Sequence, residues 1–508
     1  MSTLGLAGWH SRGALIAAVS VGAVVAVIHL LTAGRYDFFV NELYFIVCGR
    51  HPAFGYVDQP PLVPLIAAAT QVFGTNVWLL RLPAVLAAVL LIPLVVAFAE
   101  LLGASKRGAW LAAIAAASSP MLTAMTATLT TSTFEALDFT AVAYFVTRAL
   151  VRNEPRLYWW AGAFAGFAFE AKYGIAIWIA GLAAGLIAAG PRSIVRSRDL
   201  WIGAGIGAAI AMPNVVWQLV HGLPFLELVH NDSSGNLTGT PAEFIMDQIL
   251  VLNLVLAPLW MTGIIAPFAS PKFAQYRFLA VAFVVSAVIV FVTHGKSYYL
   301  AGAYPTMFAL GAAACSALPV VVVSLWAALA AVNGALSLPL VLPIYSPERL
   351  KFVVDHMPMK MRPIEKASIG APLTQVFSFE FGWRELAATV SDIYASLPAT
   401  DRAHAAIFTH NYGEAGALDV LGTNLPPSLS GNNNYYLWGP RRYDGSVIIA
   451  VNVDPAQWRR WCSSVRVVAR FGSSPYVMPR EREKPIIICR GMRPQLAQVW
   501  PQLKFYGI

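Results

Sequence analysis

The sequence predicts a polytopic α-helical membrane protein with a soluble α/β domain at its C-terminal end. Its 508 residues are 57% hydrophobic and only 12% charged, about half the charge density of a soluble globular protein. The charges are unevenly distributed: the first 345 residues hold 16 Lys and Arg and 13 Asp and Glu, whereas the last 163 hold 19 and 13. We therefore expect a membrane domain over residues 1–344 and a soluble domain over residues 345–508.

Composition and motifs exclude several other classes of protein. Four cysteines in 508 residues cannot form a small disulfide scaffold. The net charge of +9 comes with no basic run interleaved with aromatic residues, so we expect contact with anionic membrane lipids and no nucleic acid. No Walker loop is present, and the run GAGIGA at 203–208 lies within an apolar window. Its Gly203 and Gly207 are expected to let two helices pack closely, so no nucleotide cofactor is implied.

Apolar windows recur through the membrane domain. A helix needs about 20 apolar residues to cross the hydrocarbon of a bilayer. About eleven windows can be marked, near residues 13–33, 77–103, 108–122, 133–151, 157–170, 172–190, 200–220, 244–268, 278–293, 299–318 and 320–343.

The loops between these windows predict the orientation in the membrane. Lys and Arg collect in the loops on one side, which is typical of the cytoplasmic side. The other side then receives the first outer loop, 34–76, and everything after residue 344, so we expect both outside the cytoplasm. Residues 34–61 mix acidic, basic and aromatic side chains, a pattern that favours amphipathic helices lying along the membrane surface. A second interfacial helix is expected after Pro60 and Pro61.

The C-terminal domain alternates strand-like and helix-like segments. The runs 403–411, 445–453 and 484–491 are apolar and β-branched, whereas 414–422 and 455–465 have a helical pattern. This alternation is typical of a small α/β domain. Cys462 and Cys489 both lie on the oxidising side of the membrane, so a disulfide between them is one interpretation, which their spacing alone does not decide.

Ionisable residues gather at the outer ends of the predicted spans. Inserting each such group at the membrane centre costs about 2.5–3.5 kcal/mol, so ionisable residues close to a membrane span indicate a functional role. If the predicted topology holds, they lie on one face. Carboxylates beside lysines suit the removal of a proton from a hydroxyl group while a phosphate is neutralised. The residues concerned are Asp37, Glu42, Asp58, Glu135, Asp138, Glu170, Lys172, Lys296, Tyr298 and Tyr299.

Several of these residues lie in segments that resemble a known family. The run YDFFVNELYFIVCGRHPAFGYVDQPPLVPLIAAATQVFG at 36–74, followed by RLPAVLAAVLLIPLV at 81–95, is similar to the start of the dolichyl-phosphate-mannose-protein mannosyltransferase-like family of the GT-C superfamily. Lipid A aminoarabinose transferases and rhizobial galacturonosyltransferases are relatives. The AKYG element at 171–174, the HGKSYYLAGAYP hinge at 294–305 and the NYGEAGAL segment at 411–418 extend the resemblance over most of the chain, in the manner of the bacterial branch.

The resemblance implies a fold, a reaction and roles for individual residues. We expect a GT-C fold and an inverting transfer of a sugar from a polyprenyl-phosphate donor to a hydroxyl group of a periplasmic acceptor. This acceptor is lipid A, core oligosaccharide or another envelope glycan, so the reaction modifies lipopolysaccharide or a related lipid or glycan. A first-loop carboxylate takes the proton, and Asn41 stands where relatives often carry Asp, which leaves the base open. The candidates for the base are Asp37 first, Glu42 second and also Asp58, with Glu135 as a helper. The donor phosphate is expected to be bound by Lys172, Lys296, Tyr298 and Tyr299. The acceptor is expected to be bound by Asn411, Tyr412 and Glu414.

Each of these residues also has a structural interpretation. Asp37 and Glu42 can cap or solvate a helix, Asp58 can form a turn, and Glu135 can accept hydrogen bonds at a helix N-terminus. Asn411 and Glu414 have the spacing of a capping box, which is the favoured interpretation there. The two lysines can extend to the membrane interface.

Four further questions stay open at this point: the metal, the oligomeric state, the identity of sugar and acceptor, and an alternative function. The carboxylates can hold a divalent metal, although their spacing matches no standard loop. The sequence predicts no oligomeric state, and it names neither the sugar nor the acceptor. The alternative function is a carrier or flippase for a lipid-linked sugar or an organic anion. A carrier needs charged or broken helices near the middle of the membrane, whereas the charges here lie at the outer ends, which favours the enzyme.

Overall fold

The structure, a computed structural model, describes residues 11–233, 237, 239–358, 362–363 and 366–507. The chain divides into two compact units. We call them the helical unit (Met1–Arg35, Arg81–Val215 and Asn236–Ile344) and the tail unit (Tyr36–Leu80, Val216–Gly235 and Tyr345–Ile508). Most of the first outer loop therefore belongs to the same unit as the C-terminal residues.

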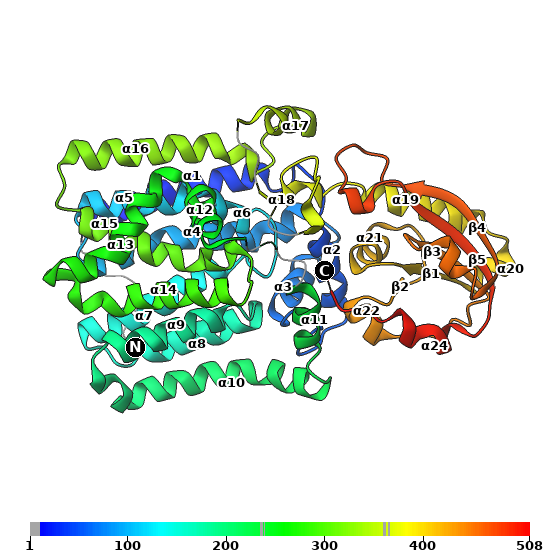
Figure 1. Cartoon of the computed structure of the whole chain (residues 1–508), viewed down its shortest axis with the longest axis horizontal. Coiled ribbons are helices and arrows are strands. Elements are labelled where there is room, and N and C mark those ends of the chain that lie inside the picture. Colours follow the sequence, from blue (N-terminus) through cyan, green and yellow to red (C-terminus); the bar gives the residue numbers. More distant parts are fainter. Residues whose placement is uncertain (1–10, 234–236, 238, 359–361, 364–365, 508) are drawn as a thin grey trace. The chain divides into compact units, whose positions relative to one another are not determined.

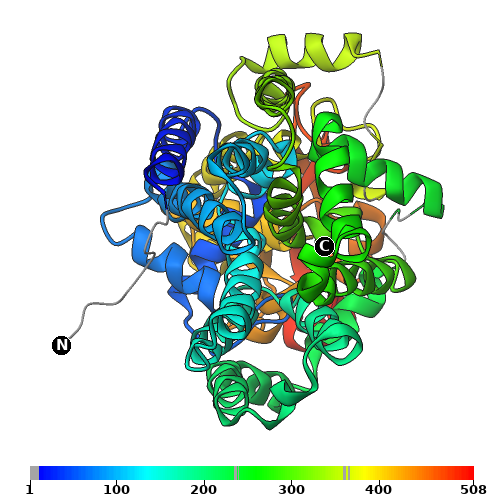
Figure 2. The ribbon, with the colours of Figure 1, turned by 90° about the vertical axis from the view of Figure 1, so that its left-hand side faces the viewer.

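The helical unit is a bundle of apolar helices joined by short loops. Figure 1 shows its longer helices running alongside one another, and the view in Figure 2 looks along many of them. Its elements are α1 (Arg12–Thr32), α4 (Val77–Leu101), α5 (Lys106–Ala117), α6 (Pro120–Met125), α7 (Glu135–Arg152), α8 (Leu157–Ala171), α9 (Ile175–Ala189), η1 (Arg192–Arg196), α10 (Arg198–Val220), α12 (Pro241–Leu252), η2 (Leu254–Leu256), α13 (Ala257–Ala269), η3 (Pro271–Tyr276), α14 (Arg277–Val292), η4 (Ser297–Ala303), α15 (Tyr304–Cys315), α16 (Val320–Ser337) and η5 (Leu338–Leu340).

Fewer helices than the predicted eleven are long and apolar enough to cross a membrane, when the helices of the structure are judged by length and composition alone. Within the described residues, five helices are long and apolar enough to cross a bilayer, and a bent pair raises the number to six. They are Arg12–Thr32, Val77–Leu101, Arg198–Val220, Pro271–Val292 and Val320–Leu340, with the pair Pro241–Leu252 and Leu254–Ala269. Several other predicted windows form helices of only 12–15 residues. The polytopic helical fold is thus confirmed, but the number eleven is not.

The bent pair turns at Asn253. Its two helices meet at an angle of 105°, and Asn253 between them has a positive φ of 101°. The buried Asn253 amide donates to the carbonyls of Ser118 and Ala330, both at 3.0 Å. Because backbone groups need partners inside a membrane, this side chain satisfies carbonyls of two neighbouring segments where the helix is broken.

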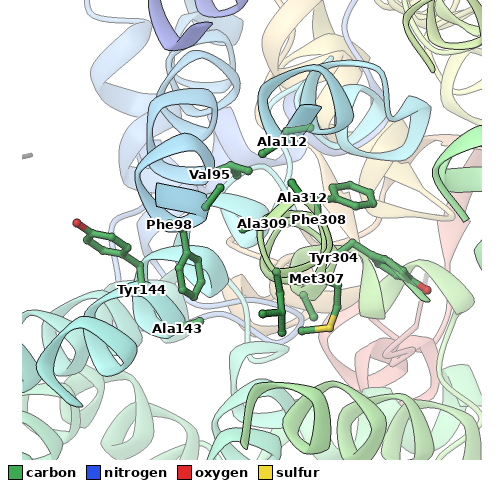
Figure 3. Close-up of a cluster of buried hydrophobic side chains, with 14 of the residues drawn as sticks. Val95, Phe98, Ala112, Ala143, Tyr144, Tyr304, Met307, Phe308, Ala309 and Ala312 are labelled. Atoms are coloured by element: carbon green, nitrogen blue, oxygen red, sulfur yellow. The ribbon is translucent and has the colours of Figure 1, made fainter. Parts of the chain in front are cut away.

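Small residues and large apolar side chains alternate in the core of the helical unit. Figure 3 shows part of this core, in which Phe98 of α4 lies beside Tyr144 of α7 and, in α15, Ala309 and Ala312 lie among larger side chains such as Phe308. On α10, a Cβ added at Gly203 would lie 2.1 Å from the carbonyl oxygen of Tyr158, and one at Gly207 would lie 2.8 Å from that of Gly162. The prediction that Gly203 and Gly207 allow close helix packing is therefore confirmed.

The tail unit combines short helices with one sheet. Its elements are α2 (Val40–Arg50), α3 (Leu62–Thr70), α11 (Pro224–Ser233), α17 (Pro347–His356), η6 (Lys366–Ser368), α18 (Gln375–Ser378), α19 (Trp383–Ser396), α20 (Ala399–Arg402), β1 (Ala405–Thr409), α21 (Tyr412–Leu421), β2 (Leu429–Ser430), α22 (Asn433–Trp438), β3 (Val447–Val451), α23 (Pro455–Trp458), β4 (Cys462–Phe471), η7 (Pro479–Glu481), β5 (Lys484–Met492), α24 (Leu496–Val499) and η8 (Trp500–Leu503).

The sheet has the order β2-β1-β3-β5-β4. The first three strands are parallel, and β5 runs antiparallel to both β3 and β4. The small C-terminal sheet domain is thus confirmed, but helix 455–465 was predicted too long. Only Pro455–Trp458 is helical, and Cys462 already begins β4, where pairing with β5 outweighs the local helical pattern. Cys462 and Cys489 form a disulfide between these two strands.

The first-loop helix α2 is held inside the tail unit. Nearly all its residues are buried because it packs against α21 and α3, and its predicted place along the membrane surface stays a prediction. Glycines of the NYGEAGAL segment permit the contact with α21: a Cβ added at Gly413 would lie 2.3 Å from Cγ2 of Val40, and one at Gly416 would lie 3.1 Å from the backbone nitrogen of Tyr44.

Candidate functional site

A lysine and a glutamate from two different helices meet in the helical unit. Glu135 is the first residue of α7, and Lys172 follows the last residue of α8 in an extended conformation. The Nζ atom of Lys172 lies 2.9 Å from Oε2 of Glu135 and 2.8 Å from Oγ of Ser132. The side chains of Lys172 and Glu135 are 18% and 5% exposed. The pair is therefore largely shielded from water but remains reachable at the lysine.

Two tyrosines of η4 complete this cluster. The Nζ atom of Lys172 lies 4.6 Å from the ring centre of Tyr299 and 5.3 Å from that of Tyr298, within the range of cation–π attraction. Lys296 directly precedes η4. We call Ser132, Glu135, Lys172, Tyr298 and Tyr299 the lysine cluster. The structure thus brings together four of the residues predicted from the sequence and adds Ser132.

One oxygen of the Glu135 carboxylate is not satisfied within the described part of the chain. Its Oε1 is buried and has no hydrogen-bond partner there, whereas its Oε2 accepts from Lys172. A Cβ added at Gly174 would lie only 2.8 Å from Oε1. The glycine of the AKYG element therefore makes room for this carboxylate. A buried oxygen without a partner is costly, so its presence beside a lysine favours a role in binding or proton transfer.

A small hollow adjoins the lysine cluster. Its lining includes Tyr298, Ser297, Gln248 and Asp247. Gln248 is fixed there, because it donates to the carbonyl of Ser297 at 3.1 Å and accepts from the hydroxyl of Tyr304 at 3.1 Å. Tyr298 lines the hollow and also faces Lys172.

The remaining predicted residues lie in the tail unit, where Asp37 is part of an ion pair. Its Oδ2 lies 2.7 Å from Nε of Arg384, and its Oδ1 accepts from Nη2 of Arg384 at 3.1 Å. The Arg384 side chain is 67% exposed, and an exposed pair of this kind contributes only about 0.2–1 kcal/mol to stability. No local pattern indicated this partner, which lies far along the chain.

Glu42 caps the helix to which it belongs. Its Oε2 accepts from the backbone N–H of Phe39 at 2.8 Å, and the residue is fully buried. The contact satisfies one of the N–H groups that every helix start leaves without a partner. The structural interpretation of Glu42 thus has direct support, and its role as a base stays a prediction.

Asp58 differs from the other two first-loop carboxylates. It is partly buried, and its Oδ1 accepts a hydrogen bond from the hydroxyl of Tyr44 at 3.0 Å. Burial raises the pKa of Asp58 to about 7, the Tyr44 hydrogen bond opposes the rise, and the nearby negative charge of Asp232 adds to it. A carboxyl group with a pKa near neutrality is well suited to exchange a proton near neutral pH.

The three predicted acceptor residues make contacts within the tail unit. Asn411 accepts from the backbone N–H of Glu414 at 3.0 Å, while Glu414 Oε2 accepts from the N–H of Asn411 at 3.2 Å. This is the capping box that the spacing predicted. Tyr412 donates to Asn41 at 2.9 Å. Burial, followed by the charge of Glu481, raises the pKa of Glu414 well above its ordinary range. These contacts are structural, and binding of an acceptor stays a prediction.

No group of three or more His, Cys, Asp or Glu residues placed to hold a metal ion occurs among the described residues.

Comparison with known proteins places the fold. A family model described as dolichyl-phosphate-mannose-protein mannosyltransferase matches residues 58–217, less than a third of the chain. The crystal structure of ArnT from Cupriavidus metallidurans bound to undecaprenyl phosphate superposes with a TM-score of 0.60 at 13% identity, covering 94% of this chain and 98% of that one. The chain has a GT-C fold.

Other structures agree with this assignment. The chain also matches the apo state of ArnT from Cupriavidus metallidurans with a TM-score of 0.61 at 13% identity, covering 92% and 97% of the two chains. The arabinofuranosyltransferase AftD from Mycobacteria matches with a TM-score of 0.51 at 15% identity over 94% of this chain and 40% of that one. No curated protein sequence matches the GT-C chain. The predicted fold and resemblance are therefore confirmed.

Proposed function

We propose that this chain is a membrane glycosyltransferase that moves a sugar from a polyprenyl-phosphate donor to a hydroxyl group of an envelope lipid or glycan. The observation that carries the proposal is the lysine cluster, in which a cation, a buried carboxylate and two aromatic rings meet within one GT-C unit. The acceptor is lipid A, core oligosaccharide or a similar periplasmic glycan. The site faces the periplasmic side of the bacterial inner membrane.

Lys172 holds the phosphate of the donor. An ammonium group has three N–H donors. Among the described residues, two of those of Lys172 donate to Ser132 and Glu135, which leaves the third for an incoming anion. Lys296, next to η4, adds a second positive charge. Tyr298 and Tyr299 stabilise the ammonium group through their ring faces. The site therefore binds the leaving phosphate without an acid that protonates it.

Among the first-loop carboxylates, we place Asp58 ahead of Asp37 and Glu42 as the base. Asp37 pairs with Arg384, and Glu42 caps α2, so each already has a structural partner that holds it in place. Asp58 receives one hydrogen bond from Tyr44 and has a pKa of about 7. Asp58 can therefore take up and release a proton near neutral pH, as a general base must.

The proposed reaction is a single displacement with inversion. The acceptor oxygen attacks the anomeric carbon as the carboxylate takes its proton, and a bond between that oxygen and the carbon forms. The bond between the anomeric carbon and the phosphate oxygen breaks through an oxocarbenium-like state. Its electron pair goes to the polyprenyl phosphate, whose developing charge is stabilised by Lys172 and Lys296.

The test is a transfer assay with the full-length purified chain. The chain is incubated in detergent with a set of labelled polyprenyl-phosphate sugars and lipid A from a strain lacking the gene. We expect free polyprenyl phosphate and labelled lipid A to appear together. Transport of the intact donor across a vesicle membrane, with no cleavage in either assay, would instead identify a carrier.

Gly174 offers a mild way to disturb the lysine cluster. In Gly174→Ala the new Cβ would lie 2.8 Å from Oε1 of Glu135, so this flexible carboxylate must move and its contact with Lys172 must change. We expect the transfer rate to fall about 10- to 100-fold, because small misplacements of reacting groups are costly, with little change in melting temperature. Gly205→Ala is the matched control, since nothing lies within 4 Å of its added Cβ. Equal rates for both variants would contradict the proposed role of Glu135.

A further inference from the structure

The loop that carries Asp58 is held by several buried contacts within the tail unit. The hydroxyl of Tyr56 donates to the carbonyl of Cys48 at 2.8 Å, and the carbonyl of Tyr56 accepts from the Gln218 amide at 2.9 Å. Tyr56 and Val57 are fully buried. The segment before Asp58 is therefore fixed both by the nearby helix α2, through Cys48, and by Gln218, which lies far away in the sequence.

Asn434 of α22 contacts this loop at two points. Its side-chain Oδ1 accepts from the backbone N–H of Val57 at 2.6 Å, one residue before Asp58. Its own backbone N–H donates to the hydroxyl of Tyr44 at 3.2 Å, and that hydroxyl donates in turn to Oδ1 of Asp58 at 3.0 Å. Asn434 is only 3% exposed. One residue thus fixes both the backbone beside Asp58 and the hydroxyl that orients its carboxyl group.

The orientation of Tyr44 is fixed by its packing as well. Its ring lies 4.6 Å from that of Tyr412 and 6.2 Å from that of Tyr435, and the residue is fully buried. The hydroxyl that accepts from Asn434 has its single proton available for Asp58. Two hydrogen bonds therefore form one directed chain from the Asn434 backbone N–H through the Tyr44 hydroxyl to the carboxylate, and the bond from Val57 to the Asn434 side chain adds a separate contact.

We propose that Asn434 is a positioning residue that sets the orientation and the burial of Asp58. The proposal rests on the proposed function for its catalytic meaning, since Asn434 acts through Asp58 and touches no substrate. It assigns to the C-terminal part of the chain a role in the chemistry, in addition to any role in choosing the acceptor.

The proton equilibrium of Asp58 provides a readout that needs no donor or acceptor. Dicyclohexylcarbodiimide reacts with protonated carboxyl groups, and the labelling of Asp58 in the full-length chain can be followed by peptide mass spectrometry between pH 5 and 9. The titratable groups that interact with Asp58 are Tyr44, Cys48, Tyr56 and Asp232. The wild-type midpoint is expected near the pKa of about 7.

Two variants are expected to move this midpoint in opposite directions. Asn434→Ala releases the Val57 backbone, so water reaches the Asp58 carboxyl group. Burial, the largest cause of its raised pKa, is then reduced. The midpoint should fall by about one pH unit or more. Tyr44→Phe keeps the ring but removes the hydrogen bond that stabilises the carboxylate, so the midpoint should rise. In the transfer assay, Asn434→Ala should reduce kcat about tenfold and change KM for the donor much less.

Asn432→Ala is the matched control. Asn432 is also buried, and its side chain makes hydrogen bonds to Tyr412, Phe505 and Gly507 but none to Tyr44, Val57 or Asp58. Its labelling midpoint should stay at the wild-type value. The inference is overturned if Asn434→Ala folds and keeps the wild-type midpoint, or if Asn432→Ala shifts it equally.

The other outcomes are also decisive. If Asn434→Ala does not fold, Tyr44→Phe decides, and an unchanged midpoint in that variant overturns the inference. If the midpoints shift as expected but no variant or wild type transfers a sugar, the proposed function fails and the positioning of Asp58 stands.

Discussion

Replacing Lys172 with methionine is expected to reduce sugar transfer by about 10²- to 10³-fold, the usual cost of removing one group that stabilises charge in a transition state. The ammonium lies 2.9 Å from Glu135 and over the ring of Tyr299, so no other side chain of the cluster replaces it. The variant should also lose about 3–5 kcal/mol of stability, because Glu135 is left buried without its partner. Initial rates of polyprenyl-phosphate release and thermal unfolding measure the two effects.

A double variant separates these effects. Lys172→Met combined with Glu135→Gln removes the stranded charge, so it should recover most of the stability but none of the activity. Recovery of both would show that Lys172 serves only its ion pair and would contradict its role on the phosphate. Lys351→Met is a surface control, because Lys351 pairs with Asp355 in an exposed position where such pairs contribute little. Its transfer rate should equal that of the wild type.

The overall architecture could be predicted from the sequence because its signals are local. Runs of apolar residues identify spans such as Arg12–Thr32, and alternating apolar and turn residues identify β1 and β3. The number of spans could not be predicted in the same way. Helices such as α5 and α15 are short yet buried by neighbouring helices, so protein contacts replace the lipid that the hydropathy argument assumes.

The site was predicted only in part, because its residues contact one another over long distances in the sequence. Glu135 and Lys172 could be named because each lies at the end of an apolar span, where a charge is unexpected. Their mutual contact depends on how α7 packs against α8, which no local pattern describes. Ser132 had no such signal, since a serine in a polar turn is ordinary.

The first-loop carboxylates show the same limit more sharply. The sequence favoured Asp37 over Asp58, because both were judged only by their position in the loop. The structure distinguishes them by partners more than 300 residues away: Arg384 pairs with Asp37, whereas Asn434 supports Tyr44 and Val57 around Asp58. The sequence signal that could have pointed to Asn434 is the run of three asparagines at 432–434, because buried side-chain amides often satisfy buried backbone groups.

Asp58→Asn is expected to lower kcat by about 10²- to 10⁴-fold, the usual contribution of a general base. Wild-type activity should rise with pH through the pKa of about 7, because the carboxyl group must be ionised to accept a proton, and this limb should be absent from the residual activity of Asp58→Asn. Asp37→Asn breaks the pair with Arg384 but leaves Asp58 intact, so it should keep the limb. Loss of the limb in Asp37→Asn, with its retention in Asp58→Asn, would transfer the role of base to Asp37.

The same group makes stability depend on pH with a defined sign. Because the folded-state pKa of Asp58 is raised to about 7, above the usual value of about 3.9 for an unfolded chain, the folded state binds the proton more tightly between these pH values. Its contribution to stability is therefore full below pH 4 and decreases as the pH rises toward 7. Asn carries no such proton, so the melting temperature of Asp58→Asn relative to wild type should be higher at pH 8 than at pH 5. A constant difference between the two proteins at both pH values would show that Asp58 is already ionised throughout this range, and that its carboxylate is not tuned to act as the base near neutral pH.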